Sequence, residues 1–261
     1  MKLKARAVEK PWGREALPPG FEASPGRRIG EIWFEAADGR PLPLLVKYLF
    51  TADRLSVQVH PDDAQARARG LANGKNECWY IVDAEPDAVV ALGLKRSVSA
   101  AALRSAALDG SIERLLRWVP VKAGDVLPVP AGTIHAIGAG ISLIEVQQPS
   151  DTTYRLYDYG RDRPLHLDEA LAVASRAGAP AAADLFAMTS LSGDAADPLE
   201  GRGRWLLPLR GLVEANGEFA GPGECLFVGA QDAARRAPGS LVLVAGERQA
   251  GAARARRRLA A

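Results

Sequence analysis

Short runs in which apolar and polar residues alternate make up most of the chain, and this period-two pattern predicts β-strands. Residues 30–39 alternate until the turn signal Asp38-Gly39, and residues 55–60 alternate up to Pro61. Residues 41–50 are almost entirely apolar, as in a strand that is buried on both faces. We expect further strands at 77–84 and 88–94, in several pieces of 119–148, and at 204–213, 223–230 and 240–246.

Helical spacing is confined to three places. Residues 97–119 are rich in Ala and Leu, and we expect one or two short helices there, starting at Ser97 or Ser99 and broken at Asp109-Gly110. Shorter helical pieces are expected at 62–70 and 167–178. Many short strands with Gly and Pro turns, and few helices, favour an all-β fold, either an antiparallel barrel or a jelly roll.

The strands fall into two groups along the chain. We predict a main barrel domain over residues 1–177, with the helical insertion at about 97–118, and a smaller β-rich domain over residues 178–250. Residues 178–200 are expected to be a connector of small residues, and the basic tail 251–261 to be disordered.

Composition narrows the partners and the compartment. The 261 residues carry 33 Lys and Arg against 31 Asp and Glu, and a net charge of +2 argues against nucleic-acid binding. We expect no membrane contact, because no run approaches the ~20 apolar residues of a membrane helix. With only Cys78 and Cys225, a disulfide framework and a cysteine-based zinc site are excluded. The N-terminal residues also lack the apolar run of a secretory signal, so we expect a cytoplasmic protein, monomeric or homodimeric.

Polar side chains that suit a metal site stand on two predicted strands. Ser56, Gln58 and His60 share one face of the strand at 55–60, and that face points either to solvent or into a barrel mouth. Lys75 and Glu77 also share a face, either as a surface ion pair or as part of a site.

A third candidate is His135, which follows the tight turn Pro130-Ala131-Gly132 and is expected near a strand end, facing a barrel opening. Together with Gln58, His60 and Glu77 it offers two imidazole nitrogens, a carboxylate and an amide oxygen. Zinc accepts such ligands, and so do iron(II) and manganese(II), so the ligands alone do not choose the metal.

A dense polar and aromatic segment follows at 145–161. Its Arg155 offers a rigid fork of donors for a sugar oxyanion or a phosphate. The alternative is a structural salt bridge from Arg155 to Asp151 or Asp158.

Taken together, these segments resemble a known family. The stretches 44–63, 74–82 and 129–161, with KPWGRE at 10–15 and GEIWFE at 30–35, resemble the type I mannose-6-phosphate isomerases, most closely their short bacterial form. The resemblance covers roughly residues 8–165 and involves several motifs in the right order. Residues 178–261 resemble the family only loosely, as the remnant of a second barrel.

The resemblance implies a cupin fold, that is, a jelly-roll β-barrel with short helical insertions and a smaller, degenerate cupin-like C-terminal domain. It implies an enzyme that holds one zinc ion per chain and interconverts mannose 6-phosphate and fructose 6-phosphate through a cis-enediol. The matching positions make Gln58, His60, Glu77 and His135 the metal ligands, and place Ser56 and Lys75 around the sugar phosphate. Arg155 matches the catalytic arginine, Glu145 an active-site acid and Lys47 a lysine of the same pocket.

Some features depart from the family or stay open. Longer members carry a large helical domain and an aromatic residue where this chain has Ile137, so a sugar-stacking contact is either missing or supplied by Trp12, Trp79 or Tyr157. The general base is Glu145, a zinc-bound water, or Lys47 if burial lowers its pKa. His166 is expected to be structural. The alternative functions are a sugar-phosphate-binding or regulatory cupin without turnover, and an iron-dependent oxygenase.

Overall fold

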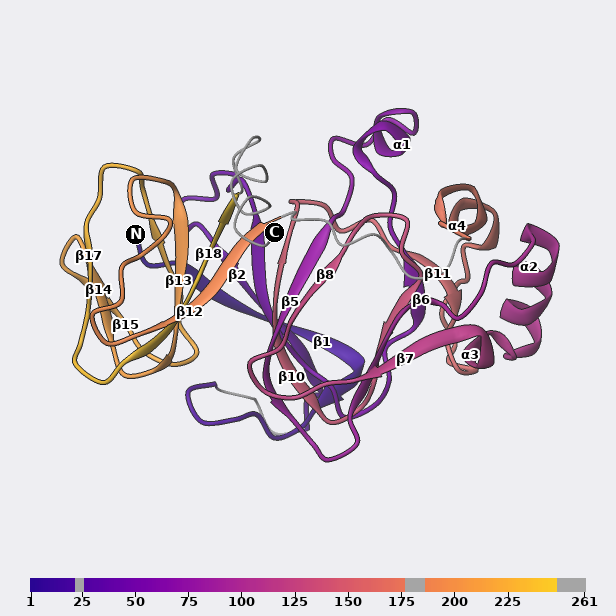
Figure 1. Cartoon of the computed structure of the whole chain (residues 1–261), viewed down its shortest axis with the longest axis horizontal. Coiled ribbons are helices and arrows are strands. Elements are labelled where there is room, and N and C mark those ends of the chain that lie inside the picture. The colour runs from indigo at the N-terminus through magenta and orange to yellow at the C-terminus, as the bar shows by residue number, and fades with distance from the viewer. Residues whose placement is uncertain (22–25, 177–185, 248–261) are drawn as a thin grey trace, which may run out of the picture.

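The computed structural model describes residues 1–21, 26–176 and 186–247. The first part of the chain forms two facing antiparallel sheets (Figure 1). The six-stranded sheet has the order β1 (Lys4–Arg14), β2 (Ile29–Glu35), β3 (Leu45–Phe50), β10 (Ile141–Gln147), β5 (Glu77–Ala84) and β8 (Val126–Val129). The five-stranded sheet has the order β11 (Tyr154–Tyr157), β4 (Val57–Val59), β9 (His135–Ile137), β6 (Val89–Leu94) and β7 (Leu116–Pro120). This is the jelly-roll barrel that the sequence pattern favours.

The C-terminal strands form a second, smaller pair of sheets, which confirms the predicted group of short strands after residue 203. One sheet has the order β12 (Phe186–Ser192), β18 (Leu241–Glu247), β13 (Arg204–Arg210) and β16 (Leu226–Val228). The other has the order β15 (Glu218–Ala220), β14 (Val213–Ala215) and β17 (Ala234–Arg236). The N terminus lies beside these strands, because the amide of Leu3 donates to the carbonyl of Cys225 (Figure 1).

The strand β3 of the six-stranded sheet is buried on both faces, which explains the long apolar run at 41–50. On β3, Val46, Tyr48 and Phe50 pack against the C-terminal sheet, in a cluster that includes Trp205. The alternate residues point into the first barrel, where Leu49 joins the core between its two sheets. Because side chains alternate along a strand, the neighbouring Lys47 also points inward.

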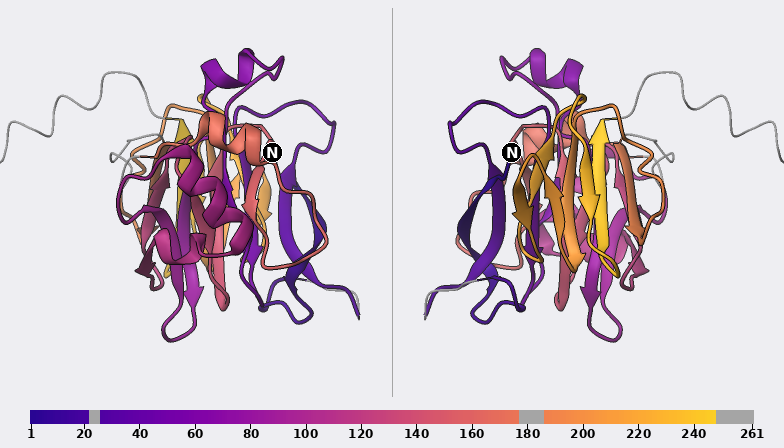
Figure 2. Two further views of the ribbon diagram at one scale, coloured as in Figure 1. Left: turned by 90° about the vertical axis from the view of Figure 1, so that its right-hand side faces the viewer. Right: turned by 90° about the vertical axis from the view of Figure 1, so that its left-hand side faces the viewer.

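Four short helices occur in the described part of the chain: α1 (Asp63–Arg67), α2 (Ala100–Asp109), α3 (Ile112–Leu115) and α4 (Leu167–Val173). Asp62 caps α1 through a capping box, and Ser99 caps α2. The helices α2, α3 and α4 lie at the end of the molecule opposite to the C-terminal sheets (Figure 2). Leu103 and Ala170 there pack in one cluster with Val57 and Val59, so the helices cover the outer face of the five-stranded sheet.

Two expectations about elements were wrong. The helical pattern ends at Leu115, and Leu116–Pro120 is the strand β7, because these residues pair with the edge of β6, with Val90 opposite Val119. The expected connector at 178–200 contains the strand β12, which pairs along its whole length with β18. The predicted boundary at 177 and the tail 251–261 lie outside the described residues. None of the described helices is long and apolar enough to cross a membrane.

Candidate metal centre and substrate pocket

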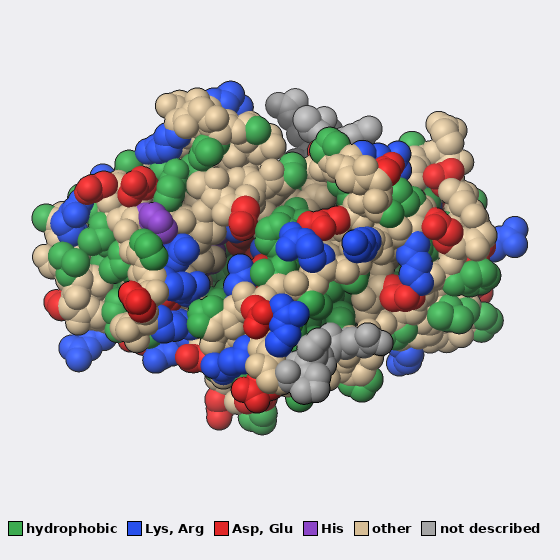
Figure 3. Space-filling model, turned by 180° about the vertical axis from the view of Figure 1, so that it is seen from behind, with side chains coloured by type: hydrophobic (Ala, Val, Ile, Leu, Met, Phe, Trp, Pro, Cys, Tyr) green, Lys and Arg blue, Asp and Glu red, His purple; other side chains and the backbone are tan. Residues whose placement is uncertain are grey.

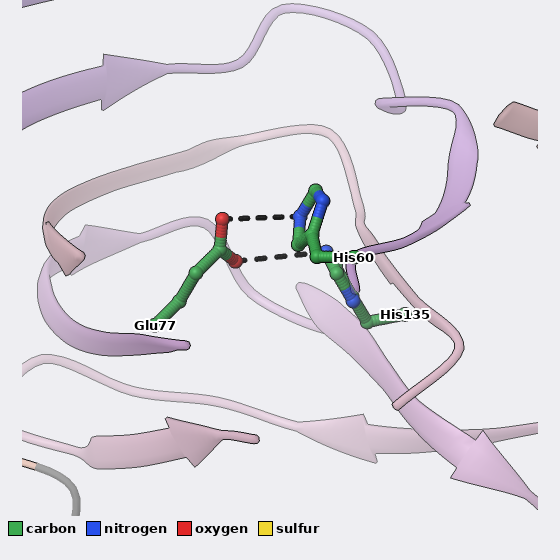
Figure 4. A group of neighbouring side chains, drawn as sticks. All are labelled: His60, Glu77 and His135. Carbon is green, nitrogen blue, oxygen red and sulfur yellow. Dashed lines mark ion pairs between the residues drawn. The ribbon is translucent and has the colours of Figure 1, made fainter. Parts of the chain in front are cut away.

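The three strongest metal-ligand candidates meet inside the first barrel. His60, Glu77 and His135 come from three separate segments, and Figure 4 shows the two imidazoles facing the carboxylate. All three side chains are buried, with relative exposures of 1%, 0% and 1%. Glu77 Oε1 lies 3.1 Å from His60 Nε2, and Glu77 Oε2 lies 3.6 Å from His135 Nε2. One ligand atom from each residue lies within 4.8 Å of the others, so the group can hold one metal ion.

Backbone carbonyls fix both imidazoles in one tautomer. His60 Nδ1 lies 2.9 Å from the carbonyl oxygen of Thr152, and His135 Nδ1 lies 2.9 Å from that of Thr133. A carbonyl only accepts, so each Nδ1 carries the proton and each Nε2 presents a lone pair. Such a second contact is typical of histidines that bind a metal.

The ligand atoms are left unsatisfied by the protein itself. His60 Nε2 and both oxygens of Glu77 are buried and have no hydrogen-bond partner among the described residues. Burial and the Lys75 ammonium lower the pKa of His60 to about 3, so the imidazole is neutral at physiological pH. Burial also lowers the pKa of His135. Lone pairs that face a carboxylate in a buried space repel one another, and a divalent cation satisfies them all.

Gln58 lies beside this group, as the strand pattern predicts. It is opposite His135 in the β4–β9 pairing, and its Nε2 lies 3.2 Å from His135 Nε2. The oxygen and nitrogen of an amide are assigned from their neighbours, and the opposite orientation turns Oε1 toward the metal group. Ser56 Oγ, which lies 3.2 Å from Gln58 Oε1, can then accept from the amide instead, so Gln58 fits as a fourth ligand.

Lys75 and Glu77 form an ion pair, but not on the surface. Lys75 Nζ lies 3.0 Å from Glu77 Oε1, and only 3% of Lys75 is exposed. Burial alone would raise the pKa of Glu77, but Lys75 and the two histidines lower it well below its ordinary value. Glu77 is therefore a carboxylate, as metal binding requires.

A second buried chain of charges runs beside the metal group across β2, β3 and β10. Lys47 Nζ lies 2.8 Å from Glu145 Oε1 and 4.0 Å from Glu31 Oε2, and Lys10 Nζ lies 3.4 Å from the same Glu31 oxygen. Two indoles hold the carboxylates: Trp79 Nε1 donates to Glu145 Oε2 at 2.9 Å, and Trp33 Nε1 donates to Glu31 Oε2 at 2.6 Å.

The pKa shifts along this row of charges distinguish two of the candidate bases, Lys47 and Glu145. Burial lowers the pKa of Lys47, but Glu145 and Glu31 raise it more, and the net shift is upward. The condition under which Lys47 could act as a base, a lowered pKa, is therefore not met. Burial and the nearby Glu77 raise the pKa of Glu145, which brings it closer to neutral pH.

A pocket of about 250 Å³ opens onto these groups. Its wall is formed by Lys10, Trp12, Glu31, Lys47, Leu49, Leu55, Ser56, Gln58, Lys75, Glu145, Asp151, Thr153, Arg155, Arg163 and His166. Blue and red charged side chains gather around a hollow on the face drawn in Figure 3, next to a histidine. No sequence pattern predicted Lys10, Glu31 and Arg163 as wall residues, and His166, which was expected to be structural, also lines the pocket.

Arg155 is the cation of this wall that has no ion-pair partner among the described residues. Asp158 pairs instead with Arg163, at 2.6 Å from Nε, and with Arg161. Arg155 Nε is buried and unsatisfied. The salt bridge considered as the alternative for Arg155 does not form, and the guanidinium is available to a ligand.

Of the three aromatic residues considered for sugar stacking, only Trp12 lines the pocket. Trp79 is fully buried and donates to Glu145. Tyr157 packs edge-on against Tyr159, in the cluster below the helices. Ile137 lies in the core between the sheets.

Comparison with known proteins gives the chain a clear relationship. It is 47% identical over 137 residues to the mannose-6-phosphate isomerase of Streptococcus mutans serotype c. The aligned region covers 50% of this chain and 43% of the relative. It is 38% identical over 204 residues to mannose-6-phosphate isomerase ManA of Bacillus subtilis, covering 63% and 64%. The chain thus spans about half to two thirds of the length of the curated relatives it matches. No protein-family model matches the sequence.

The fold has equally clear neighbours. The crystal structure of the mannose 6-phosphate isomerase from Bacillus subtilis superposes with a TM-score of 0.76 at 26% identity, over 94% of this chain and 98% of that one. A putative mannosephosphate isomerase from Archaeoglobus fulgidus superposes with a TM-score of 0.78 at 18% identity, over 95% and 97%, and so shares the fold. In sequence and in fold, this chain is therefore similar to mannose-6-phosphate isomerases.

Proposed function

We propose that the chain is a metal-dependent aldose–ketose isomerase that interconverts D-mannose 6-phosphate and D-fructose 6-phosphate through a cis-enediol. The observation that carries this proposal is that a group of metal-ligand atoms lies next to a pocket with an unpaired arginine. The metal-ligand atoms of His60 and Glu77 are unsatisfied, and Gln58 and Lys75, which contact His135 and Glu77, line a pocket. The wall of the same pocket carries Arg155, which has no ion-pair partner among the described residues. Isomerisation of a sugar needs both, since the carbonyl end must be polarised and the negative charge that develops there must be stabilised.

Zinc is the proposed metal, one ion per chain, held by Gln58, His60, Glu77 and His135. When bound, it would supply a Lewis acid for the oxygens on C1 and C2 of the sugar.

Proton transfer between C1 and C2 is assigned to Glu145. Its carboxylate lines the pocket, and its raised pKa suits a group that takes a proton and returns it near neutral pH. Trp79 and Lys47 hold one oxygen each, which fixes the direction of the carboxylate. Lys47 keeps its proton and acts as a fixed cation beside Glu145.

Arg155 is assigned to the oxyanion of the enediol. Its guanidinium lines the pocket and is not neutralised by an ion pair, so its charge is available where negative charge develops. Ser56 and Lys75 lie at the buried end, where they contact Gln58 and Glu77. We assign them to the sugar at that end of the pocket.

A coupled assay tests the proposal. Formation of fructose 6-phosphate from mannose 6-phosphate is followed in the purified protein, after chelation, and after zinc, iron(II) or manganese(II) is added back. Activity that chelation removes and zinc restores supports both the reaction and the metal. Sugar-phosphate binding without turnover in the zinc-loaded protein would indicate a binding cupin, and oxygen consumption with iron would indicate an oxygenase.

A further inference from the structure

The half-buried His166 lies on the pocket wall, although the sequence pattern gave it no role. It stands in the loop between β11 and α4. The metal-binding imidazoles are almost completely buried, whereas His166 is partly accessible to solvent.

His166 and Arg155 are joined by two hydrogen bonds between different atoms. The backbone amide of Arg155 donates to His166 Nδ1 at 3.2 Å, and the backbone amide of His166 donates to the carbonyl of Arg155 at 2.8 Å. These bonds hold the imidazole ring next to the strand that carries the unpaired guanidinium.

The first of these bonds fixes the tautomer. Because Nδ1 accepts an N–H, it cannot carry the proton, so the neutral ring carries its proton on Nε2. Burial and the Arg155 guanidinium lower the pKa of His166, which favours this neutral form. No described residue accepts from Nε2, and His166 is only half-buried. A residue of the pocket wall thus carries an N–H donor without a partner in the described part of the chain.

We propose that His166 is a specificity-determining residue whose Nε2–H, on the pocket wall beside the backbone of Arg155, binds the phosphoryl group of the substrate. The inference rests on the proposed function for the identity of the ligand. The reacting carbons must lie beside the fully buried metal group, so the phosphoryl group on C6 points away from it, toward the more accessible part of the wall to which the half-buried His166 belongs.

Two isosteric substitutions separate the two nitrogens of the ring. In His166→Asn, the side-chain oxygen can replace Nδ1 as the acceptor for Arg155, but the Nε2 donor is lost. In His166→Gln, the amide nitrogen can replace the Nε2 donor, but the acceptor for Arg155 is lost. A residue that only positions Arg155 would be harmed more by Gln, whereas a residue that binds the ligand would be harmed more by Asn.

The experiment measures the dissociation constants of inorganic phosphate and mannose 6-phosphate by calorimetry, in the zinc-loaded wild type and both variants. Zinc content and thermal midpoint confirm that each protein is folded and loaded. Loss of one hydrogen bond to an anion predicts roughly 10- to 100-fold weaker binding of both ligands by H166N, and a smaller loss for H166Q. Any other order, including equal losses or no loss in both variants, overturns the proposal.

The assay of the same samples separates this inference from the proposed function. If the expected order of affinities is found but the wild type forms no fructose 6-phosphate, the isomerase assignment fails and the anion site stands. If the wild type forms fructose 6-phosphate but the expected order of affinities is not found, the isomerase assignment is supported and the proposed role of His166 is wrong.

Discussion

His60 Nε2 and Glu77 Oε1 lie 3.1 Å apart in the barrel interior. His60 Nε2 has no hydrogen-bond partner among the described residues, and Glu77 Oε1 has the Lys75 ammonium beside it, at 3.0 Å. The imidazole proton is committed to the carbonyl of Thr152, so both facing atoms are acceptors. Two buried acceptors in contact are unfavourable unless a cation lies between them. The stability of this site therefore depends on whether a cation is bound between the two acceptors.

The first prediction concerns that dependence. Replacement of His60 by Ala should lower the affinity for zinc by at least about 100-fold, because a direct ligand contributes more than the outer contacts that cost 10- to 100-fold. Turnover should be lost with the metal, while the strands keep their packing. Metal content after dialysis and circular dichroism check both points. His166→Asn is the matched control, since it removes a histidine of the same pocket and should keep its zinc; equal metal content in both variants would contradict the ligand assignment.

The sequence pattern predicted the metal group because its members follow local rules. The period of two placed Gln58 and His60 on one face, and the turn before His135 set that residue at a strand end. The local sequence could not show whether these strand faces point to solvent or into the barrel. It depends on β10, which lies between β3 and β5 and so closes the sheet around Lys47, Glu145 and the neighbours of Glu77.

The missed residues share a physical reason. Glu31 and Lys10 belong to β2 and β1, and reach the site only because β2 pairs with β3 in a register that sets Trp33 opposite Lys47. Such pairing between distant segments leaves no periodic signal. His166 lies in a loop, where no period applies, and its contact with Arg155 is made through backbone atoms that any sequence possesses.

The second prediction concerns Glu31, which is buried between two lysines. Glu31→Gln should destabilise the protein by about 2 kcal/mol, since the charged acceptor of the Trp33 hydrogen bond is lost and Lys10 loses its partner, while Lys47 keeps its pair with Glu145. Glu35→Gln is the matched control: it lies on the same strand, but its ion pair with Arg6 is exposed, so the expected cost is below about 1 kcal/mol. Urea unfolding of the metal-free proteins at pH 7 measures the loss of unfolding free energy in both variants. Equal losses would show that the buried ion pairs of Glu31 contribute no more to stability than the exposed pair of Glu35.

The same variant has a pH signature. Burial raises the pKa of Glu31, but Lys47 and Lys10 lower it more, and the net shift is downward. A carboxyl with a lowered pKa in the folded state stabilises the protein above its unfolded pKa, and this contribution is lost as the pH falls through the folded pKa. The difference in unfolding free energy between the wild type and E31Q should therefore shrink below about pH 4.5. A difference that stays constant to lower pH would contradict the shift.

The third prediction separates catalysis from binding at Arg155. Arg155→Ala should lower kcat by about 10²- to 10³-fold, as the loss of a fixed charge at a developing oxyanion does, and should raise KM much less. Arg161→Ala is the control, because that guanidinium pairs with Asp158 and does not line the pocket. If KM rises while kcat is kept, Arg155 anchors the substrate and the oxyanion must be stabilised by another group.

The fourth prediction uses the two indoles that donate to carboxylates, Trp79 and Trp33, to identify the general base. Trp79→Phe removes the donor to Glu145 Oε2, and loss of a hydrogen bond to the charged form raises a carboxyl pKa. If Glu145 takes the proton in its ionised form, the acid limb of kcat/KM against pH should move upward by about one unit, since one such bond is worth 1.5–3 kcal/mol. Trp33→Phe removes the equivalent donor from Glu31, a carboxylate that is not the proposed base, and should leave the limb in place. A limb that moves in neither variant, or in Trp33→Phe instead, would exclude Glu145 and leave a metal-bound water as the remaining candidate. The comparison is decisive because both indoles are on the same sheet, both donate to a buried carboxylate, and only one of those carboxylates faces the metal group closely enough for Glu77 to raise its pKa.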